Sequence, residues 1–372
     1  MKILLLTNMY PSEQAPNYGV FVQRTESILK KAGHNLVLVA LTKKFSFAQK
    51  LLGYFNYVLK FFTNALFAKP DVIYVHYASQ NARIVVLLKK IKPSIPIILN
   101  THGTDILPQS KAQEKYQPAV HRLMNEVDHV IVPSTYYQKV VKEKYNYQGP
   151  VTIFPSGGVN TEFFHPDAEK GNQFRRGNNI PMDKTVISYI SRVDAYKGWD
   201  TLLESVSLLK ENPAAFNEIH VVIAGSGAQD ELLLKKVQEF NLSDKVTRKP
   251  MLTQMEMHEV FNASDVFCFP SFQESLGLVG LEAMATGLPL LASNIPGTKD
   301  YVNEKNSLVF DAGNADELAD TIVKFLHLTT EERQSLREHA RETAIKFDSS
   351  IVTDKLLNVF TQKTVLESKR GT

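Results

Sequence analysis

The sequence predicts an α/β protein built from two parallel sheets, each wound with helices on both faces. Strand and helix patterns alternate through the first half of the 372 residues, and a second alternation follows an irregular polar stretch. Such alternation is typical of doubly wound sheets, because parallel neighbouring strands need a crossover connection that is usually a helix. A chain of this length also has room for two ordinary domains.

The elements of the first domain are expected from the very start of the chain. Short apolar runs predict strands, and longer segments with apolar residues three or four positions apart predict helices. We expect strands at 3–8, 36–41, 72–76, 97–101 and 130–133, and helices at 20–31, 82–90 and 113–125.

The two domains are expected to join near residues 156–160, which places the first in 1–158 and the second in 159–350. The second opens with a polar region, 169–183, that we expect to be irregular. The alternation then predicts strands at 186–190, 220–224, 266–269 and 288–292, and helices at 201–209, 231–240, 315–328, 331–345 and 351–365.

One early segment, residues 45–67, departs from this plan because it is rich in Phe and Tyr and is interrupted or flanked by lysines. A basic, aromatic-rich helix of this kind is typical of a helix that lies in a membrane interface. The alternative is a helix that covers the sheet and leaves some aromatic side chains exposed. We therefore hold residues 43–69 as a candidate contact with an anionic membrane surface.

Charge is distributed unevenly along the chain. The net charge is only +3, but residues 1–150 carry 19 Lys and Arg against 8 Asp and Glu, and the remainder carries 23 against 31. Such segregation is informative about partners rather than about fold. Anionic lipid or a pyrophosphate-linked acceptor would suit the basic half, whereas no recognised nucleic-acid module accompanies the charge, so nucleic acid is not expected.

The cysteine count and the length of the apolar runs indicate the cellular compartment. The single cysteine, Cys268, excludes a disulfide framework and fits a reducing environment. The apolar run at residues 1–7 is too short for the apolar region of a signal peptide. No apolar stretch approaches the length of a membrane-spanning helix. We expect a cytoplasmic protein and leave open a peripheral position on the inner face of the plasma membrane.

The segment with the most chemical information is 271–285, where two carboxylates, Glu274 and Glu282, stand in an almost wholly apolar run. We expect the run from Leu276 onward to form a buried helix, in which a charged Glu needs a polar partner. Gly277 lets another group approach the backbone, and the amides of the first turn form an anion site. A helix with these features suits a sugar nucleotide.

This segment resembles the E-x7-E region of family 4 glycosyltransferases, which have the GT-B fold of two Rossmann-like domains facing each other across a deep cleft. Further matches occur in the family's order along the chain. They are H-G-x-D at 102–105, G-G-V-N at 157–160, R-x4-K-G at 192–198 and a glycine turn at 223–227. Motifs in a consistent order are more specific than any one of them.

The resemblance implies roles for four catalytic residues. Arg192 and Lys197 would bind the phosphates of the leaving group, Glu274 would contact hydroxyls of the donor sugar, and His102 would lie near the reacting carbon. Because no two aspartates are two positions apart, a metal-holding Asp-x-Asp pair is missing from the sequence. Cationic side chains and helix amides would therefore stabilise the diphosphate. No metal and no cofactor is expected.

The resemblance also implies a donor site and part of an acceptor site. Glu282 would accept hydrogen bonds from the ribose hydroxyls, and the remaining donor-binding positions are Gly19, Gly225, Gly227, Leu276, Gly277 and Leu278. Tyr18 and Asp105 are weaker candidates for acceptor contact, with orientation of the loop as the other role of Asp105. Family members often carry paired glycines at residues 18–19, and a glycine-containing turn is common near 249–252, where this chain has Lys-Pro-Met-Leu. The base preference is therefore not readable, although a UDP-sugar is favoured.

The implied reaction is sugar transfer with retained anomeric configuration. A front-face route is preferred over double displacement, because no carboxylate is clearly placed as a nucleophile. The acceptor is expected on a lipid-linked glycan of the cell envelope, and the last helix, about 351–372, is expected to pack back on the first domain.

Three alternative functions are compatible with parts of the sequence, and the third of them is disfavoured. They are transfer to a soluble small acceptor, a catalytically silent sugar-nucleotide-binding partner protein, and a nicotinamide dehydrogenase. The last is poorly supported because Gly225 and Gly227 are followed by Asp230 where G-x-G-x-x-G needs a third glycine.

Overall fold

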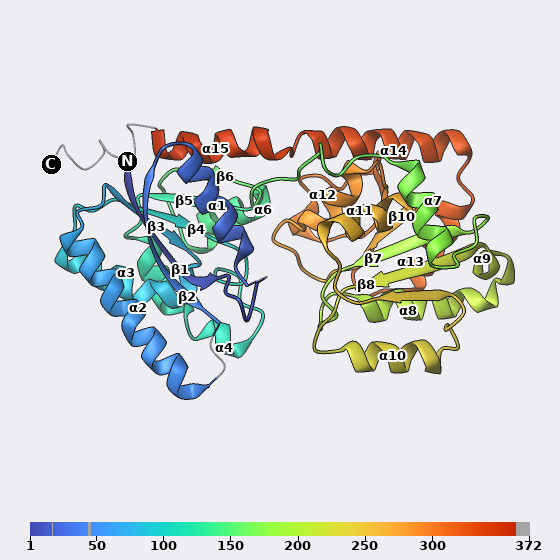
Figure 1. The fold of residues 1–372 in the computed structure, drawn as a ribbon, viewed down its shortest axis with the longest axis horizontal. Coiled ribbons are helices and arrows are strands. Elements are labelled where there is room, and N and C mark those ends of the chain that lie inside the picture. Colours follow the sequence, from blue (N-terminus) through green and yellow to red (C-terminus); the bar gives the residue numbers. More distant parts are fainter. Residues whose placement is uncertain (17, 44–45, 362–372) are drawn as a thin grey trace. The chain divides into compact units, whose positions relative to one another are not determined.

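The computed structural model describes residues 1–16, 18–43 and 46–361. It divides into two compact units, Met1–Gly158 with Ser350–Thr372, and Val159–Ser349. Residues 17 and 44–45, and the part of the expected final helix beyond Thr361, lie outside the described residues. Each unit is an α/β layer structure in which helices cover both faces of a sheet (Figure 1), so the predicted fold class is confirmed.

The first unit is built on a parallel sheet with the strand order β2-β1-β3-β4-β5-β6. Strand β1 lies between β2 and β3 and pairs with both, with Leu5 opposite Leu38 and Tyr74. The five predicted strands are present, and a sixth was missed because it is only three residues long. The strands are β1 Lys2–Tyr10, β2 Asn35–Thr42, β3 Val72–His76, β4 Ile97–Asn100, β5 His129–Val132 and β6 Val151–Ile153.

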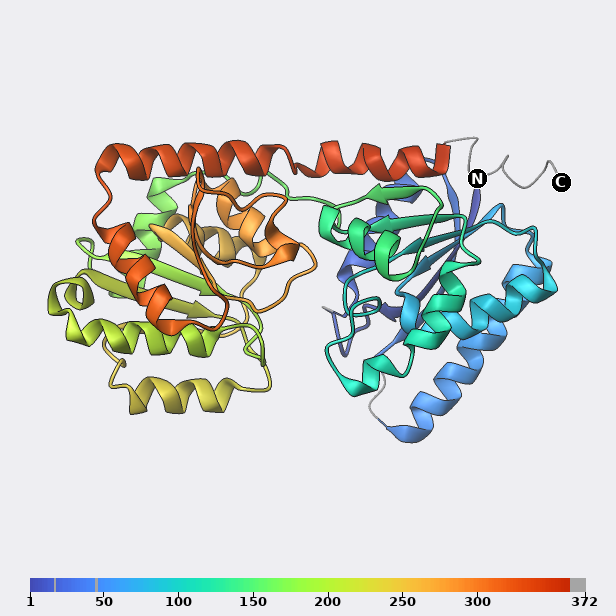
Figure 2. The same ribbon diagram turned by 180° about the vertical axis from the view of Figure 1, so that it is seen from behind.

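The helices of the first unit bury two separate apolar faces of this sheet. Leu4 and Leu6 point to the face covered by α2, α3, α5 and α6, whereas Ile3 and Leu5 point to the face covered by α1 and α15, as side chains alternate along a strand. Figures 1 and 2 show this arrangement from opposite sides. The helices are α1 Val20–Lys31, α2 Phe47–Phe67, α3 Ala78–Ile91, α4 Lys111–Glu114, α5 Gln117–Met124, α6 Thr135–Lys144 and α15 Ser349–Thr361.

The predicted helix at 113–125 is wrong in its extent, because two short helices, α4 and α5, occupy this region. Pro118 lies in the first turn of α5. Proline has no amide hydrogen to donate and is tolerated there, but it cannot continue a preceding helix. The break at Lys115 and Tyr116 follows from it.

The second unit contains a parallel sheet with the order β12-β11-β10-β7-β8-β9. The four predicted strands are present. The two edge strands, β9 and β12, were missed because their sequences, VTRK and SLVF, lack a long apolar run. The strands are β7 Thr185–Ile190, β8 Ile219–Ala224, β9 Val246–Lys249, β10 Val266–Phe269, β11 Leu290–Ser293 and β12 Ser307–Phe310.

Helices also cover both faces of the second sheet, with α8, α10 and α13 on one side and α11, α12 and α14 on the other. The region expected to be irregular contains α7, which begins after Asp167, whose side chain accepts a hydrogen bond from the amide of Lys170. The helices are α7 Ala168–Gly177, α8 Trp199–Leu208, α9 Pro213–Glu218, α10 Asp230–Glu239, α11 Gln254–Asn262, α12 Leu278–Ala285, α13 Ala315–Leu326 and α14 Thr330–Ile345, with 3-10 turns at Leu209–Glu211 and Pro296–Thr298.

The aromatic segment forms α2, which has one buried and one exposed apolar face. Tyr57, Phe61 and Ala65 are buried against the sheet, whereas Phe55 is 68% exposed and Leu51 is 64% exposed. The helix thus covers the sheet and leaves part of its apolar surface exposed, and contact of residues 43–69 with a membrane stays a prediction. Within the described residues, no helix has the length and apolar character needed to cross a bilayer.

Candidate active site

In the second unit, the loops after neighbouring strands β7 and β10 bring two predicted residues into contact. Lys197 follows β7 and Glu274 follows β10, and the Lys197 Nζ lies 2.6 Å from the Glu274 Oε1. Their side chains are 19% and 14% exposed. The hydroxyl of Ser271 donates a second hydrogen bond to the same carboxylate oxygen, at 2.9 Å. The pair lies at the carboxyl edge of the parallel sheet, where ligands bind in open α/β folds.

The helix that follows Glu274 presents backbone amides without a side-chain cap. Gly277 is the N-cap of α12 and has a left-handed conformation, with φ of 83°. A Cβ atom there would lie 2.5 Å from the Phe269 ring and 3.1 Å from the Tyr301 hydroxyl, so only glycine fits. The tyrosine also donates to the Gly277 carbonyl at 3.0 Å. The amides of Leu278 and Val279 therefore begin a helix whose positive end suits an anion.

The expectation that the whole segment from Leu276 onward is a buried helix is wrong in its first turn. Leu276 is buried but precedes the helix, and Leu278, Val279 and Glu282 are only partly buried. This helix starts at the carboxyl edge of the sheet, so its first turns lie at the surface, whereas Ala283 to Ala285 are packed in the core. Glu282 is thus half-buried, one turn after Leu278.

Arg192 is oriented differently from Lys197. Its side chain is 73% exposed, and its guanidinium donates to Asp194 at 2.5 Å. Among the described residues, Arg192 does not join the ion pair of Lys197 and Glu274. Asp194 in turn accepts from the amide of Ala228 at 2.9 Å, which ties the loop after β7 to the loop after β8.

The two glycines of the loop after β8 permit close contact between these loops. A Cβ atom at Gly225 would lie 1.8 Å from the Ser191 carbonyl oxygen, and one at Gly227 would lie 2.2 Å from the Val193 carbonyl oxygen. Gly225 also has a φ of 117°. Both positions therefore require glycine for backbone packing. The motif alone did not reveal this structural reason for the two glycines.

In the first unit, His102 lies in a cluster of rings beyond the end of β4. Its Nε2 lies 3.0 Å from the Nδ1 of His76. The Phe21 ring is centred 4.4 Å away, and the Tyr77 ring stacks at 6.0 Å. Burial lowers the pKa of His102 to about 3 and holds the pKa of His76 well below its usual value. Both imidazoles are therefore neutral near pH 7, and one donates to the other.

Asp105 holds the loop that carries His102. Its carboxylate is fully buried and accepts from the amides of Ala78, His102 and Gly103, at 2.9 to 3.0 Å. Burial raises the pKa of Asp105, and the amide hydrogen bonds partly offset that rise. Of the two roles considered for Asp105, these contacts favour orientation of the loop over contact with an acceptor.

Tyr18 and Gly19 lie where the long loop after β1 reaches α1. Gly19 is the left-handed N-cap of this helix, and a Cβ atom there would lie 2.5 Å from the Met9 carbonyl oxygen. The Tyr18 hydroxyl donates to the Asn8 carbonyl at 3.4 Å. Tyr18 also lines a cavity of about 640 Å³, together with Lys50 and Arg83.

Two family models match the chain, and together they span most of it. The model described as "Glycosyltransferase Family 4" matches residues 15–163, and "Glycosyl transferases group 1" matches residues 171–343. The chain belongs to the family 4 glycosyltransferases.

Relatives of this glycosyltransferase have names that refer to different compounds. It is 28% identical, over 68% of its length, to the D-inositol 3-phosphate glycosyltransferase of Saccharomonospora viridis, of which the match spans 59%. It is 22% identical, over 88% of its length, to the putative teichuronic acid biosynthesis glycosyltransferase TuaC of Bacillus subtilis, of which 90% is covered.

Solved structures show that the glycosyltransferase shares the GT-B fold. Sucrose-phosphate synthase from Thermosynechococcus elongatus superposes with a TM-score of 0.80 at 20% identity, over 97% of this chain and 98% of that one. Anabaena HepE, solved in complex with UDP, gives a TM-score of 0.76 at 17% identity, over 97% of this chain and 100% of that one.

Each unit adds residues that the sequence did not single out. In the second unit, Ser271 opens the segment 271–285, but no role was predicted for it. In the first unit, Phe21, His76 and Tyr77 contact His102 and belong to none of the family motifs. His76 could have been predicted from the sequence, because it is the last residue of β3 and His102 follows the neighbouring strand β4. The carboxyl ends of parallel strands lie at one edge of a sheet. Among the described residues, no cluster of His, Cys, Asp and Glu is arranged to hold a metal ion.

Proposed function

We propose that this glycosyltransferase moves a sugar from a nucleotide-sugar donor, with a UDP-sugar favoured, to an acceptor hydroxyl, with retained configuration and without a divalent metal. The observation that carries the proposal is the contact of Lys197 with Glu274 beside the uncapped start of α12. A cation and helix amides suit the leaving diphosphate, and a carboxylate suits the sugar hydroxyls.

Each residue has one task in the proposed donor complex. Lys197 and Arg192 bind diphosphate oxygens, the amides after Gly277 share that charge, and Glu274 accepts from the sugar. Glu282, half-buried on α12, accepts from the ribose hydroxyls. His102, neutral at pH 7, hydrogen-bonds the sugar near its reacting carbon. HepE, solved in complex with UDP-glucose, supports the choice of a uridine donor.

The reaction follows a front-face route in this proposal. The acceptor oxygen bonds to the anomeric carbon on the face from which the diphosphate departs. The bond between that carbon and the phosphate oxygen breaks with its electron pair on the oxygen, which takes the proton of the acceptor hydroxyl. A covalent glycosyl-enzyme adduct, detected by intact mass, would contradict this route and favour double displacement.

For the acceptor we favour a lipid-linked glycan of the cell envelope, which places the enzyme on the inner face of the plasma membrane. The support is the excess of basic residues in 1–150 and the exposed apolar side chains of α2, together with similarity to TuaC, named for teichuronic acid biosynthesis. The second candidate is a soluble phosphorylated acceptor, favoured by similarity to the D-inositol 3-phosphate glycosyltransferases.

The test is thermal stabilisation of the purified protein by UDP, GDP, ADP and dTDP, with and without EDTA. A ligand at about a hundredfold its dissociation constant adds roughly 2.7 kcal/mol to the free energy of unfolding. We expect a shift with UDP that EDTA leaves unchanged and Glu282→Ala abolishes. No shift with any nucleotide, for a folded protein, would contradict the donor site and favour a silent partner protein.

A further inference from the structure

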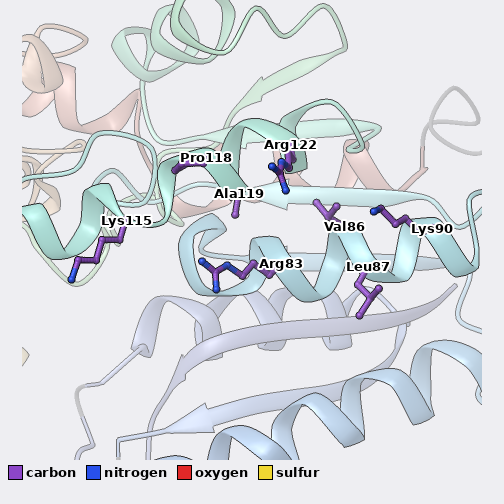
Figure 3. Close-up of a pocket in the computed structure, with 8 residues that line it drawn as sticks. All are labelled: Arg83, Val86, Leu87, Lys90, Lys115, Pro118, Ala119 and Arg122. Atoms are coloured by element: carbon purple, nitrogen blue, oxygen red, sulfur yellow. The ribbon is translucent and has the colours of Figure 1, made fainter.

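A groove in the first unit, between α3 and the region of α4 and α5, gathers cations that the proposed donor and acceptor chemistry does not use. Its volume is about 510 Å³, and it is lined by Arg83 and Lys90 of α3 and by Lys115 and Arg122 across from them, with no acidic side chain in the lining. Figure 3 shows these side chains around Val86 and Ala119. We call it the basic groove.

The cations of the basic groove are not needed for packing. All four are exposed, and no ion pair formed by the described residues uses any of them. Lys89, their neighbour on α3, is the contrast, because it is buried and bonds Asp128 at 3.3 Å. Like charges that converge without acidic partners create a positive potential that attracts anions.

The basic groove adjoins the cavity that contains Tyr18. Arg83 lines both, and the second cavity adds the cation Lys50 and the ring of Tyr54. A positively charged surface thus runs from the proposed acceptor residue Tyr18, past Arg83, to Arg122. Phosphate groups are the anions that such a surface best accommodates, since Arg and Lys both bind phosphate oxygens.

Exposed apolar side chains accompany the cations. Arg83, Leu87, Lys90 and Ile91 lie on one face of α3 at helical spacing, and Leu87 and Ile91 are 49% and 56% exposed. The neighbouring α2 exposes Leu51, Phe55 and Leu59 by 55 to 68%. The two helices are joined by the Tyr57 hydroxyl, which donates to the Asn81 Oδ1 at 2.6 Å.

We infer that the basic groove binds the phosphate headgroups of anionic phospholipid and that, with the exposed apolar faces of α2 and α3, it docks the first unit on an anionic bilayer. This inference rests on the proposed function and assigns its membrane contact to a defined site. A surface that exposes both apolar and basic side chains favours a bilayer over a free phosphate as the ligand, because a small anion needs no apolar surface.

The experiment is co-sedimentation of the full chain with vesicles of phosphatidylcholine alone and of phosphatidylcholine mixed with phosphatidylglycerol. The groove variant is Lys90→Ser with Arg122→Ser. The matched control is Lys139→Ser with Lys142→Ser, which removes the same charge from exposed positions on α6. Each cation near an anionic leaflet contributes roughly fivefold to partitioning, so the groove variant should lose about 25-fold and the control far less.

Three outcomes would overturn the inference. The first is equal sedimentation of the wild type with both vesicle types, and the second is an equal loss of vesicle binding in both double variants. The third is that no form of the protein binds vesicles, while the groove variant loses binding of inorganic pyrophosphate. The last result would assign the basic groove to a free phosphate group.

A second measurement separates this inference from the proposed function. The groove variant should keep its circular dichroism spectrum and its stabilisation by UDP, because neither groove cation belongs to the donor site. Loss of vesicle binding with intact UDP stabilisation supports the basic groove. Vesicle binding without any nucleotide effect would contradict the proposed function and leave the docking surface supported.

Discussion

Lys197 and Glu274 form the best-defined pair of the site, because each residue makes a further hydrogen bond besides their mutual ion pair. Glu274 also accepts from Ser271, and the Tyr189 hydroxyl donates to the Lys197 carbonyl at 3.3 Å. Both side chains are largely shielded from water, which would strengthen the proposed interaction with a diphosphate or a sugar. In the proposed function, a pair fixed in this way meets the condition for electrostatic catalysis.

We predict that Lys197→Ala lowers the transfer rate at saturating donor by about 100- to 1000-fold, the usual loss when one group that stabilises a developing charge is removed. The measurement is the initial rate of sugar transfer from the nucleotide sugar. Lys235→Ala is the control, because Lys235 is 70% exposed on α10 and pairs with Glu239. A wild-type rate in Lys197→Ala would exclude the proposed role.

The neutral histidines predict a pH dependence of stability. An ordinary histidine has a pKa near 6.5, whereas the pKa of His102 in the folded protein is about 3. The unfolded chain therefore binds more protons between these values, and the free energy of unfolding must fall as the pH is lowered below about 6.5. His76 contributes in the same direction.

We predict that His102→Gln reduces the slope of stability against pH, measured by urea unfolding between about pH 6.5 and pH 4. The matched control is His327→Gln, which replaces an exposed histidine after α13 by the same residue, and the readout is the difference between the slopes of the two variants. An unchanged slope in His102→Gln would mean that its imidazole is not shielded from protons.

At the scale of elements, glycines determine how closely the loops of the second unit approach one another. Gly225, Gly227 and Gly277 all occupy positions where a Cβ atom would collide with backbone or ring atoms. The sequence reasoning assigned these glycines to donor binding. The structure adds that they are required before any donor is present, since the loops after β7, β8 and β10 could not otherwise form.

We predict that Gly225→Ala lowers the free energy of unfolding by at least about 1–3 kcal/mol, from its positive φ and its contact with the Ser191 carbonyl. Gly177→Ala is the control, because Gly177 ends α7 and no atom beyond its chain neighbours and its own helix backbone lies within 4 Å of the added methyl group. That variant should be as stable as the wild type or slightly more stable. Equal urea midpoints for both variants would refute the steric argument.

Helix α2 shows why an apolar pattern can leave a function open. Tyr57 and Phe61 are four positions apart and buried, as expected of a helix that covers a sheet. Leu51, Phe55 and Leu59 have the same spacing but are exposed. Periodicity identifies a stripe, but only the packed neighbours decide whether it is covered.

At the scale of the molecule, the chain returns to the first unit through its last described helix. Four side chains of α15 are buried in one cluster with β1, β3 and α1, namely Val352, Leu356, Val359 and Phe360. The first unit is therefore made from both ends of the sequence. Its core joins Ile3 of β1 to Val352 of α15, although the two residues are 349 positions apart in the sequence.

We predict that Leu356→Ala destabilises the first unit by about 2–5 kcal/mol, the range for truncating a fully buried leucine. Hydrogen exchange read by mass spectrometry should show faster exchange in β1 and β3 and unchanged exchange in β7 and β8. Leu234→Ala, at a half-exposed leucine of α10, is the control and should alter neither unit appreciably. Equal acceleration in both units would show that they unfold as one.

The sequence by itself determined the α/β class, the strands inside each sheet and the family, because apolar periodicity and motif spacing are local properties of the chain. It did not determine the edge strands β9 and β12, whose side chains lack a long apolar run, or the break before Pro118. Only the tertiary structure decided which distant residues meet: Lys197 with Glu274, His76 with His102, and Arg83 with Arg122 around the basic groove. The physical reason is that such contacts depend on strand order and helix packing, which are set by the burial of the whole core rather than by any one segment.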